Sequence, residues 1–442
     1  MTDLEFHIQV DPNVESIVMP ENVKIGLMVT EHRKNCSKLS CSFDYHAFAI
    51  GQSPFHVPEP LEASLRENTH QSHYSASIGI SELREAIAEF NNRYFNFNID
   101  PSLVVIGHGT KGMIFTIFSL IKGDVIIPAP SWISYVPQIK LLGKNFHIID
   151  LKPEDEYKLT AENLDNFLSN LHQDQHLLVL NSPHNPSGAV YRRDELEKLA
   201  DICRKHGILV LSDEIYALAT YDQESFASMR SDYPEGTFVT NGLSKDRGAA
   251  GYRLGHCLLP ENCSEELQLN FKKIAATIYT NVSTPTQYAA ITAYKQNDVI
   301  DEYIKITREI HRIMGTNLSR EVGKIEGLEV TTPTGGFYFL VSFNKLKNGL
   351  LKHNVKMANE LSNALLKHPF HIAALTGDAC LFNPDDFTAR VAFVDYDGRQ
   401  AFNNYKIRTP RTEEEESEFF KTNAPRMFQA ITTFKEFVTS LK

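Results

Sequence analysis

Short apolar runs alternate with amphipathic stretches between about residue 75 and residue 290, and this alternation restricts the possible fold. In one stretch, residues 194–206, Leu196, Leu199 and Cys203 recur at helical spacing. The apolar runs short enough to be buried strands are 103–106, 125–127, 177–180, 208–211, 238–240 and 257–259. Because neighbouring parallel strands are joined through a crossover, usually a helix, the pattern predicts an α/β domain with a mainly parallel sheet flanked by helices.

The pattern changes near residue 300, where a long polar helix is expected over 301–322. The strands expected after it are 328–331, 337–342 and 390–394. We interpret this part as a smaller α+β domain that the N-terminal arm joins. The predicted bounds are 1–50 for the arm and part of the small domain, 51–320 for the large domain and 321–442 for the C-terminal small domain. Residues 399–425 are expected to form a solvated linker or helix face.

The composition is ordinary for a soluble globular enzyme, with 442 residues, 42% hydrophobic and 22% charged. A net charge of -11 argues against nucleic acid or an anionic membrane as a partner. We find no signal peptide and no apolar run as long as a membrane span, so a cytoplasmic protein with reduced thiols is expected. No Cys-x-x-Cys pair occurs, and His172 and His176 lie in a predicted solvated loop, so no metal site is expected.

Three predicted strands are followed by polar segments that can carry chemistry. These segments are 181–188, 212–216 and 241–245. Since the carboxyl ends of parallel strands meet at one edge of the sheet, the three segments are expected to converge. Lys245 could bind a carbonyl cofactor as an imine, and Arg253, eight residues later, could hold a phosphate of the same molecule. Each segment alone could be a turn, a helix cap or core, but three coincidences in this order are improbable.

The motifs at these strand ends resemble those of fold-type-I pyridoxal-5′-phosphate enzymes of the class I/II aminotransferase family. They are Asn-Pro-Ser-Gly at 185–188, Ser-Asp-Glu-Ile-Tyr at 212–216, Ser-Lys at 244–245 and Gly-Tyr-Arg-Leu-Gly at 251–255. The resemblance extends from about Gly51 to Arg390. It implies a seven-stranded, mainly parallel sheet in the large domain, a small domain built by both termini, and a homodimer. It also implies a ping-pong exchange of an amino group between an amino acid and a 2-oxo acid.

The resemblance assigns roles around the ring of the cofactor, pyridoxal 5′-phosphate. Lys245 would form the imine and then move the substrate Cα proton as base and acid. Asp213 would pair with the pyridine nitrogen and keep it protonated, which makes the ring an electron sink. Asn185 and Tyr216 would donate hydrogen bonds to the ring oxygen, which lowers the pKa of the imine.

The remaining expected roles concern the phosphate and the substrate. The cofactor phosphate would be held by Arg253, by Ser244 and by the helix start at Gly109, Thr110 and Lys111. Trp132 would stack on the ring of the cofactor. Tyr74 would reach the phosphate in the neighbouring subunit. For the substrate, Arg390 would clamp the α-carboxylate, with Asn185 and the backbone of Gly51 beside it. No basic residue is assigned to the far end of the substrate, so aromatic or aliphatic donors are expected over strictly dicarboxylate ones.

Other functions remain open at this point. The segment 107–112 fits a G-x-G-x-x-G dinucleotide loop, but the next predicted strand ends in Pro128-Ala129-Pro130 without the acidic residue that such a site needs. Ser244-Lys245-Asp246 resembles aminocyclopropane-carboxylate synthases, so an enzyme that eliminates a β- or γ-substituent is the alternative. An aminotransferase-like sensor is weaker, because only about fifty residues precede Gly51 and no helix-turn-helix is evident among them.

Two positions depart from the family pattern. Gly242 stands where many relatives carry a phosphate-binding serine, and Arg247, in an unusually charged segment, could contact phosphate or substrate.

Overall fold

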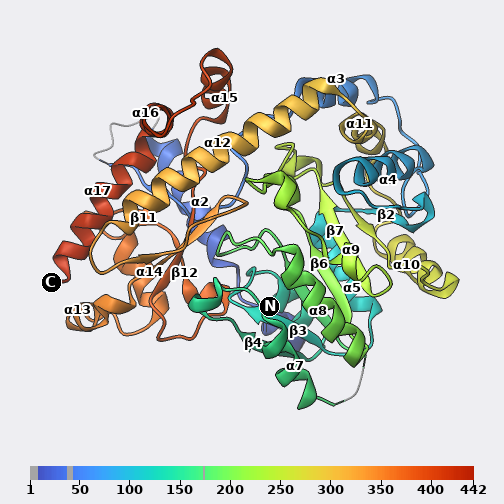
Figure 1. The fold of residues 1–442 in the computed structure, drawn as a ribbon, viewed down its shortest axis with the longest axis horizontal. Coiled ribbons are helices and arrows are strands. Elements are labelled where there is room, and N and C mark those ends of the chain that lie inside the picture. Colours follow the sequence, from blue (N-terminus) through green and yellow to red (C-terminus); the bar gives the residue numbers. More distant parts are fainter. Residues whose placement is uncertain (1–7, 37–42, 173–174) are drawn as a thin grey trace, which may run out of the picture.

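The computed structural model describes residues 8–36, 43–172 and 175–442. A seven-stranded sheet forms its larger part, in the order β2-β8-β7-β6-β5-β3-β4 (Figure 1). The strands are β2 (Val104–Gly107), β3 (Val125–Ala129), β4 (Phe146–Asp150), β5 (Leu177–Asn181), β6 (Leu209–Asp213), β7 (Thr237–Gly242) and β8 (Gly255–Leu258). The strand β8 runs antiparallel to both of its neighbours, β2 and β7, and the remaining pairs of described strands in this sheet are parallel. The predicted fold class, including the seven strands, is confirmed.

Both faces of this sheet are buried, which explains why its strands are continuous apolar runs. Side chains alternate along β5: Leu177 and Val179 belong to one hydrophobic cluster, and Leu178 and Leu180 to another on the opposite face. The helices in this part of the chain are α3 (Glu59–Glu67), α4 (Ser81–Phe95), α5 (Gly109–Leu120), α6 (Tyr135–Leu141), α7 (Ala161–Ser169), α8 (Arg193–His206), α9 (Met229–Asp232), α10 (Glu265–Ile278) and α11 (Thr284–Tyr294).

The amphipathic stretch predicted at 194–206 is α8. Its apolar residues Leu196, Leu199 and Cys203 are buried, and the helix ends at Gly207, whose φ of +66° suits a left-handed cap. The helix α5 starts two residues after β2 ends. Because β2 runs in the same direction as β5, β6 and β7, the N-terminus of α5 lies at the edge of the sheet where these strands also end.

The second part of the molecule contains a four-stranded antiparallel sheet in the order β12-β13-β10-β9. The strands are β9 (Glu329–Val330), β10 (Tyr338–Ser342), β12 (Leu375–Thr376) and β13 (Thr388–Ala392). In addition, β1 (His46–Ala47) pairs with β11 (Ile372–Ala373), so the N-terminal segment does lie against the C-terminal part. The helices are α1 (Pro12–Glu15), α2 (Glu21–Cys36), α12 (Asp298–Gly323), α13 (Lys347–Lys352), α14 (Ala358–Leu366), α15 (Gly398–Ile407), α16 (Glu413–Asn423) and α17 (Pro425–Ser440).

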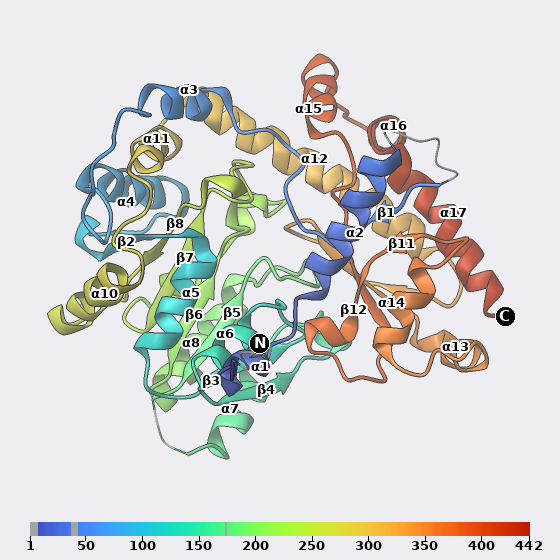
Figure 2. The same ribbon diagram turned by 180° about the vertical axis from the view of Figure 1, so that it is seen from behind.

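The long helix α12 runs between the two parts (Figures 1 and 2). The predicted boundary at residue 320 falls inside this helix, whose apolar face belongs to a hydrophobic cluster that includes residues of both parts. The domain bounds therefore stay a prediction. Of the two alternatives expected for 399–425, a solvated linker or a helix face, the structure has the helices: α15 and α16 occupy most of the segment, with Glu413 and Glu414 exposed and Phe419 and Phe420 buried. Glu416 of α16 forms an ion pair of 2.5 Å with Arg312 of α12.

Two further expectations concern the environment of the chain. None of the helices in the described ranges is long and apolar enough to cross a membrane. Cys203, Cys257, Cys263 and Cys380 are free thiols, as expected, but Cys36 is disulfide-bonded, against the expectation of reduced thiols. Cys41 lies outside the described residues.

The helix α12 offers a direct test of this packing. Leu318 is fully buried, and we expect Leu318→Ala to lower the free energy of unfolding by about 2–5 kcal/mol, because the cavity left behind adds to the lost transfer energy. Val299 in the first turn is 54% exposed, so Val299→Ala is the control and should change stability by no more than about 0.5 kcal/mol. Urea denaturation measures both. Equal effects would contradict the burial of this helix face.

Candidate active site

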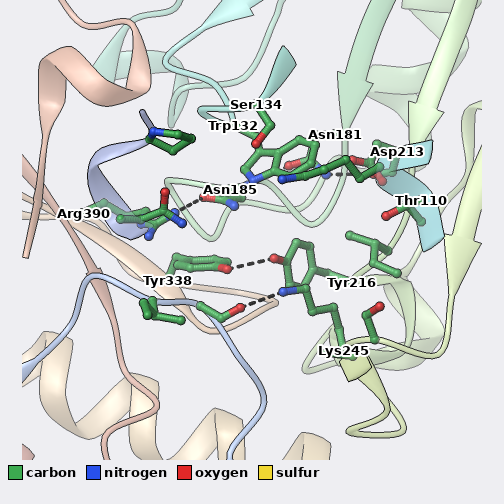
Figure 3. Close-up of a pocket in the computed structure, with 18 of the residues that line it drawn as sticks. Thr110, Trp132, Ser134, Asn181, Asn185, Asp213, Tyr216, Lys245, Tyr338 and Arg390 are labelled. Atoms are coloured by element: carbon green, nitrogen blue, oxygen red, sulfur yellow. Dashed lines mark hydrogen bonds between the residues drawn. The ribbon is translucent and has the colours of Figure 1, made fainter. Parts of the chain in front are cut away.

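A cavity of about 260 Å³ lies at the carboxyl ends of β5, β6 and β7 (Figure 3). The register of the sheet sets Asn181 beside Asp213, and Asp213 beside Thr240, so the three predicted strand ends are neighbours. Eleven of the thirteen predicted site residues line the cavity: Gly51, Thr110, Lys111, Trp132, Asn185, Asp213, Tyr216, Ser244, Lys245, Arg253 and Arg390. Gly109 adjoins it, and Tyr74 lies outside it with 87% of its surface exposed.

Lys245 follows β7 and extends its amine into the cavity. Its Nζ donates a hydrogen bond of 2.7 Å to the carbonyl oxygen of Gly51. The Nζ also lies 5.5 Å from the centre of the Tyr216 ring and 5.4 Å from that of Phe337. Burial, together with the nearby Arg390 cation, lowers the pKa of Lys245 to about 8. About a tenth of the amine is therefore neutral at pH 7, far more than for a lysine with its usual pKa of about 10.4, and this neutral form can act as a nucleophile.

Asp213 is the last residue of β6 and is 3% exposed. Burial raises its pKa to about 6, although hydrogen bonds and the charge of Lys245 act in the opposite direction. The strongest of these bonds is donated by the Tyr135 hydroxyl to Asp213 Oδ2 over 2.7 Å, and Thr240 Oγ1 lies 3.3 Å from Oδ1. Tyr135 was not predicted as a site residue; it lies three residues after Trp132 but carries no motif of its own.

Arg390 and Asn185 approach the cavity from different parts of the fold. Arg390, on β13, donates through Nη1 to Asn185 Oδ1 over 3.1 Å and through Nη2 to the carbonyl oxygen of Ala49 over 2.5 Å. The backbone amide of Asn185 donates to Asn181 Oδ1 over 2.7 Å, which holds the loop against the strand end. Because Arg390 takes the oxygen of the Asn185 side chain, the amide NH₂ is left for a ligand. Arg390 Nε is buried and has no partner within the described residues.

The other end of the cavity is built for an anion. The helix α5 begins at Gly109, where the backbone amides of the first turn are free of helical partners. Arg253 lies against this helix start: a Cβ on Gly109 would sit 2.6 Å from Arg253 Nη2. A Cβ on Gly255 would sit 2.6 Å from the backbone nitrogen of Thr110, so the backbones approach closely. Burial, with the charge of Arg253, lowers the pKa of Lys111.

The cavity has a marked excess of positive charge. Among its described lining residues, Asp213 is the one acid, whereas Lys111, Lys245, Arg253 and Arg390 are basic. This balance favours a ligand with several negative groups. Within the described ranges, no group of three or more His, Cys, Asp or Glu side chains could hold a metal ion.

Several lining residues were missed by the sequence analysis. Tyr338 contributes a hydroxyl 2.8 Å from that of Tyr216, and Asn181 and Ser134 also face the cavity. Asn181 was detectable, because it directly follows the predicted strand 177–180 and opens the polar segment 181–188. Tyr338 was hidden in an apolar run predicted only as a strand.

Arg247 does not reach the cavity. It is 1% exposed, forms an ion pair of 2.8 Å with Asp246, and lies between the rings of Phe90 and Tyr294 at 4.6 and 4.8 Å from their centres. Its contacts are thus internal to the protein, and the suggested phosphate or substrate contact is wrong.

Residues 45–395 match the sequence profile of aminotransferase class I and II. The chain belongs to this family. A probable aspartate/prephenate aminotransferase of Aquifex aeolicus is 32% identical over 68% of this chain and 76% of its own length. The aromatic-amino-acid aminotransferase 2 of Thermococcus litoralis is 32% identical over 66% of this chain and 75% of its own.

The fold agrees with this membership. The aspartate aminotransferase of Thermus thermophilus, solved with maleate, superposes with a TM-score of 0.79 at 23% identity, covering 98% of this chain and 100% of that one. The predicted activity is confirmed: the protein is an aminotransferase, and the elimination alternative is not favoured.

The lowered pKa of Lys245 can be measured on the cofactor-free enzyme. We expect its reaction with a small aldehyde, trapped by borohydride, to rise with pH with a midpoint near pH 8, because only the neutral amine reacts. Surface lysines of the same protein should keep rising toward about pH 10.4. Peptide mapping of the trapped adducts separates the two groups. A Lys245 profile that follows the surface lysines would contradict the electrostatic description of the cavity.

Proposed function

We propose that this aminotransferase binds pyridoxal 5′-phosphate in the cavity and exchanges amino groups by two half-reactions. The observation that carries the proposal is the position of Lys245, with the single acid Asp213 and the cationic end around Arg253 lining the same cavity. When bound, the cofactor supplies an aldehyde for amines and a ring that accepts the electrons left when the substrate Cα loses its proton.

The residues fit the cofactor group by group. The phosphate suits the helix start at Gly109, where Arg253 and the backbone of Thr110 would leave no room for a Cβ on Gly109 or Gly255. The pyridine nitrogen suits Asp213, the one acid among the described residues that line the cavity.

The chain's own groups then act as follows. Lys245, with its lowered pKa, would be the nucleophile toward the cofactor aldehyde, and later its neutral amine would take the Cα proton and the resulting ammonium would return it. Asp213 holds a proton on the ring nitrogen, and the hydrogen bond from Tyr135 favours the ionised carboxylate that this requires. Tyr216 and the NH₂ of Asn185 donate to the ring oxygen.

The substrate carboxylate is assigned to Arg390. Its guanidinium is buried, held on one side by Asn185 and Ala49, and keeps the unpaired Nε. A carboxylate is the natural partner for such a planar fork of donors. The relatives are named for aspartate, prephenate, asparagine and aromatic amino acids, so we leave the donor side chain open.

We further propose a homodimer in which each active site is completed by its partner. Arg253 and Lys111 are exposed in a single chain, so the phosphate end of the cavity is open to solvent. Tyr74 is 87% exposed, and its neighbour Ser75 accepts a hydrogen bond from Gln287, which anchors this segment at the surface. A tyrosine presented in this way can reach the open end of a second copy.

The cofactor proposal is tested by absorption spectroscopy of the enzyme loaded with pyridoxal phosphate. We expect a visible band that borohydride fixes onto Lys245, and that a pool of amino acids, without any oxo acid, converts to the band of the aminated cofactor. Lys245→Ala should lose the borohydride adduct but keep phosphate affinity, because Arg253 and Lys111 are unchanged. A protein that shows no visible band at saturating cofactor would refute the proposal. Individual donors can then be ranked by the rate of band conversion.

Shared active sites are tested by mixing variants. Tyr74→Phe should weaken cofactor affinity by roughly 10–100-fold, the loss of a hydrogen bond to a charged group. Mixed with Lys245→Ala, it should recover about a quarter of wild-type activity at limiting cofactor, because a mixed dimer keeps one site with both residues intact. Tyr74→Phe mixed with itself is the control. Activity no higher than the sum of the separate variants would argue against sites shared through Tyr74.

A further inference from the structure

The hydroxyl groups of Tyr216 and Tyr338 lie 2.8 Å apart inside the cavity (Figure 3). Tyr216 follows β6 of the large sheet, whereas Tyr338 begins β10 of the small one, so this hydrogen bond joins the two parts of the fold. The side chains are 4% and 2% exposed. Within the described residues, the Tyr338 hydroxyl has no other hydrogen-bond partner.

The position of Tyr338 is closely constrained. The Arg390 guanidinium carbon lies 4.7 Å from the centre of its ring, and a Cβ on Gly51 would lie 1.7 Å from its hydroxyl oxygen. A side chain at position 51 would therefore displace the phenol. The carbonyl oxygen of Gly51 in turn accepts the hydrogen bond from Lys245. Tyr338 thus contacts three groups of the cavity: Arg390, Gly51, which holds the Lys245 amine, and Tyr216.

The direction of the hydrogen bond follows from counting protons. A phenol has one O–H to donate, and its oxygen can also accept. If Tyr216 donates to the ring oxygen of the cofactor, as the proposed function has it, it has no proton left for Tyr338. The bond between the two phenols must then run from Tyr338 to Tyr216. Accepting a hydrogen bond polarises Tyr216 and makes it a stronger donor.

We propose that Tyr338 is a positioning residue that acts through Tyr216, by donating to its oxygen and directing the Tyr216 proton at the ring oxygen of the cofactor. The inference rests on the proposed function. Tyr338 touches Tyr216 rather than the ring oxygen, so its effect is on the strength of the Tyr216 donor. A stronger donor stabilises the ring oxyanion and lowers the pH at which the lysine nitrogen bound to the cofactor loses its proton.

The test is a pH titration of the visible absorption of the cofactor-loaded protein, without substrate. Tyr338→Phe should raise the midpoint by about 0.4–1 pH unit, the equivalent of one hydrogen bond. Phenylalanine keeps the ring against Arg390 and fills the same space. The charged groups that face Lys245, namely Arg390, Asp213, Arg253 and Lys111, are all retained.

A double-mutant cycle separates an effect through Tyr216 from a direct one. Tyr216→Phe alone should raise the midpoint. Adding Tyr338→Phe should cause no further shift, because the Tyr216 hydroxyl through which Tyr338 acts is already absent. Tyr221→Phe is the matched control: its hydroxyl bonds to the Gly336 carbonyl oxygen at 3.3 Å and does not line the cavity, so the midpoint should stay unchanged.

The possible failures can be told apart. An unshifted midpoint in Tyr338→Phe, or an equal shift in the presence and absence of the Tyr216 hydroxyl, would overturn the role of Tyr338 and leave the cofactor proposal standing. A wild-type protein without a visible band would refute the cofactor proposal, and this inference with it. If the role of Tyr338 were only structural, Tyr338→Phe would lower the melting temperature, but a shift of the midpoint would not depend on the presence of the Tyr216 hydroxyl.

Discussion

The active site depends on the register between β5, β6 and β7. This register pairs Asn181 with Asp213 and Asp213 with Thr240, so side chains from three strands meet within about 5 Å of one another at each step. A slip of one residue in β6 would turn Asp213 to the other face of the sheet, because side chains alternate. The loops after these strands carry Asn185, Tyr216 and Lys245 from the same edge. The backbone hydrogen bonds that pair these strands therefore also fix the relative positions of the side chains in the cavity.

Much of this could be predicted from the sequence, because strands buried on both faces are short apolar runs and the polar residues after them are conspicuous. The strand β4 was not predicted, because it is not buried on both faces and so does not form a continuous apolar run. It lies at the edge of the sheet, and Phe146, His147 and Ile148 are only half-buried, so its sequence is mixed. The glutamates at 413–416 left a solvated linker and a helix face open; they occupy the first turn of α16, where negative charge is favourable and Thr412 caps the helix.

The convergence of the three strand ends was predictable, but individual contacts between side chains from distant segments were not, because no local pattern encodes them. Tyr135 and Asp213 are 78 residues apart, and Tyr216 and Tyr338 are 122 apart. The unusual glycine before the lysine also has a tertiary cause. A Cβ on Gly242 would lie 2.8 Å from the carbonyl oxygen of Leu254, because β7 and β8 approach closely there. A serine at this position would require the backbone to move.

The charges of the cavity also favour an order of events at Lys245. After burial, the Arg390 cation contributes most to lowering the pKa of the amine, with smaller contributions from Arg253 and Lys111, whereas Asp213 raises it. An amine surrounded by unpaired cations is deprotonated more easily, which suits the nucleophile that must capture the cofactor. In the proposed function, a phosphate bound at Arg253 and Lys111 and a carboxylate bound at Arg390 would largely neutralise these cations. Lys245 would then become more basic, at the stage when the proposed reaction needs it to take a proton from the substrate.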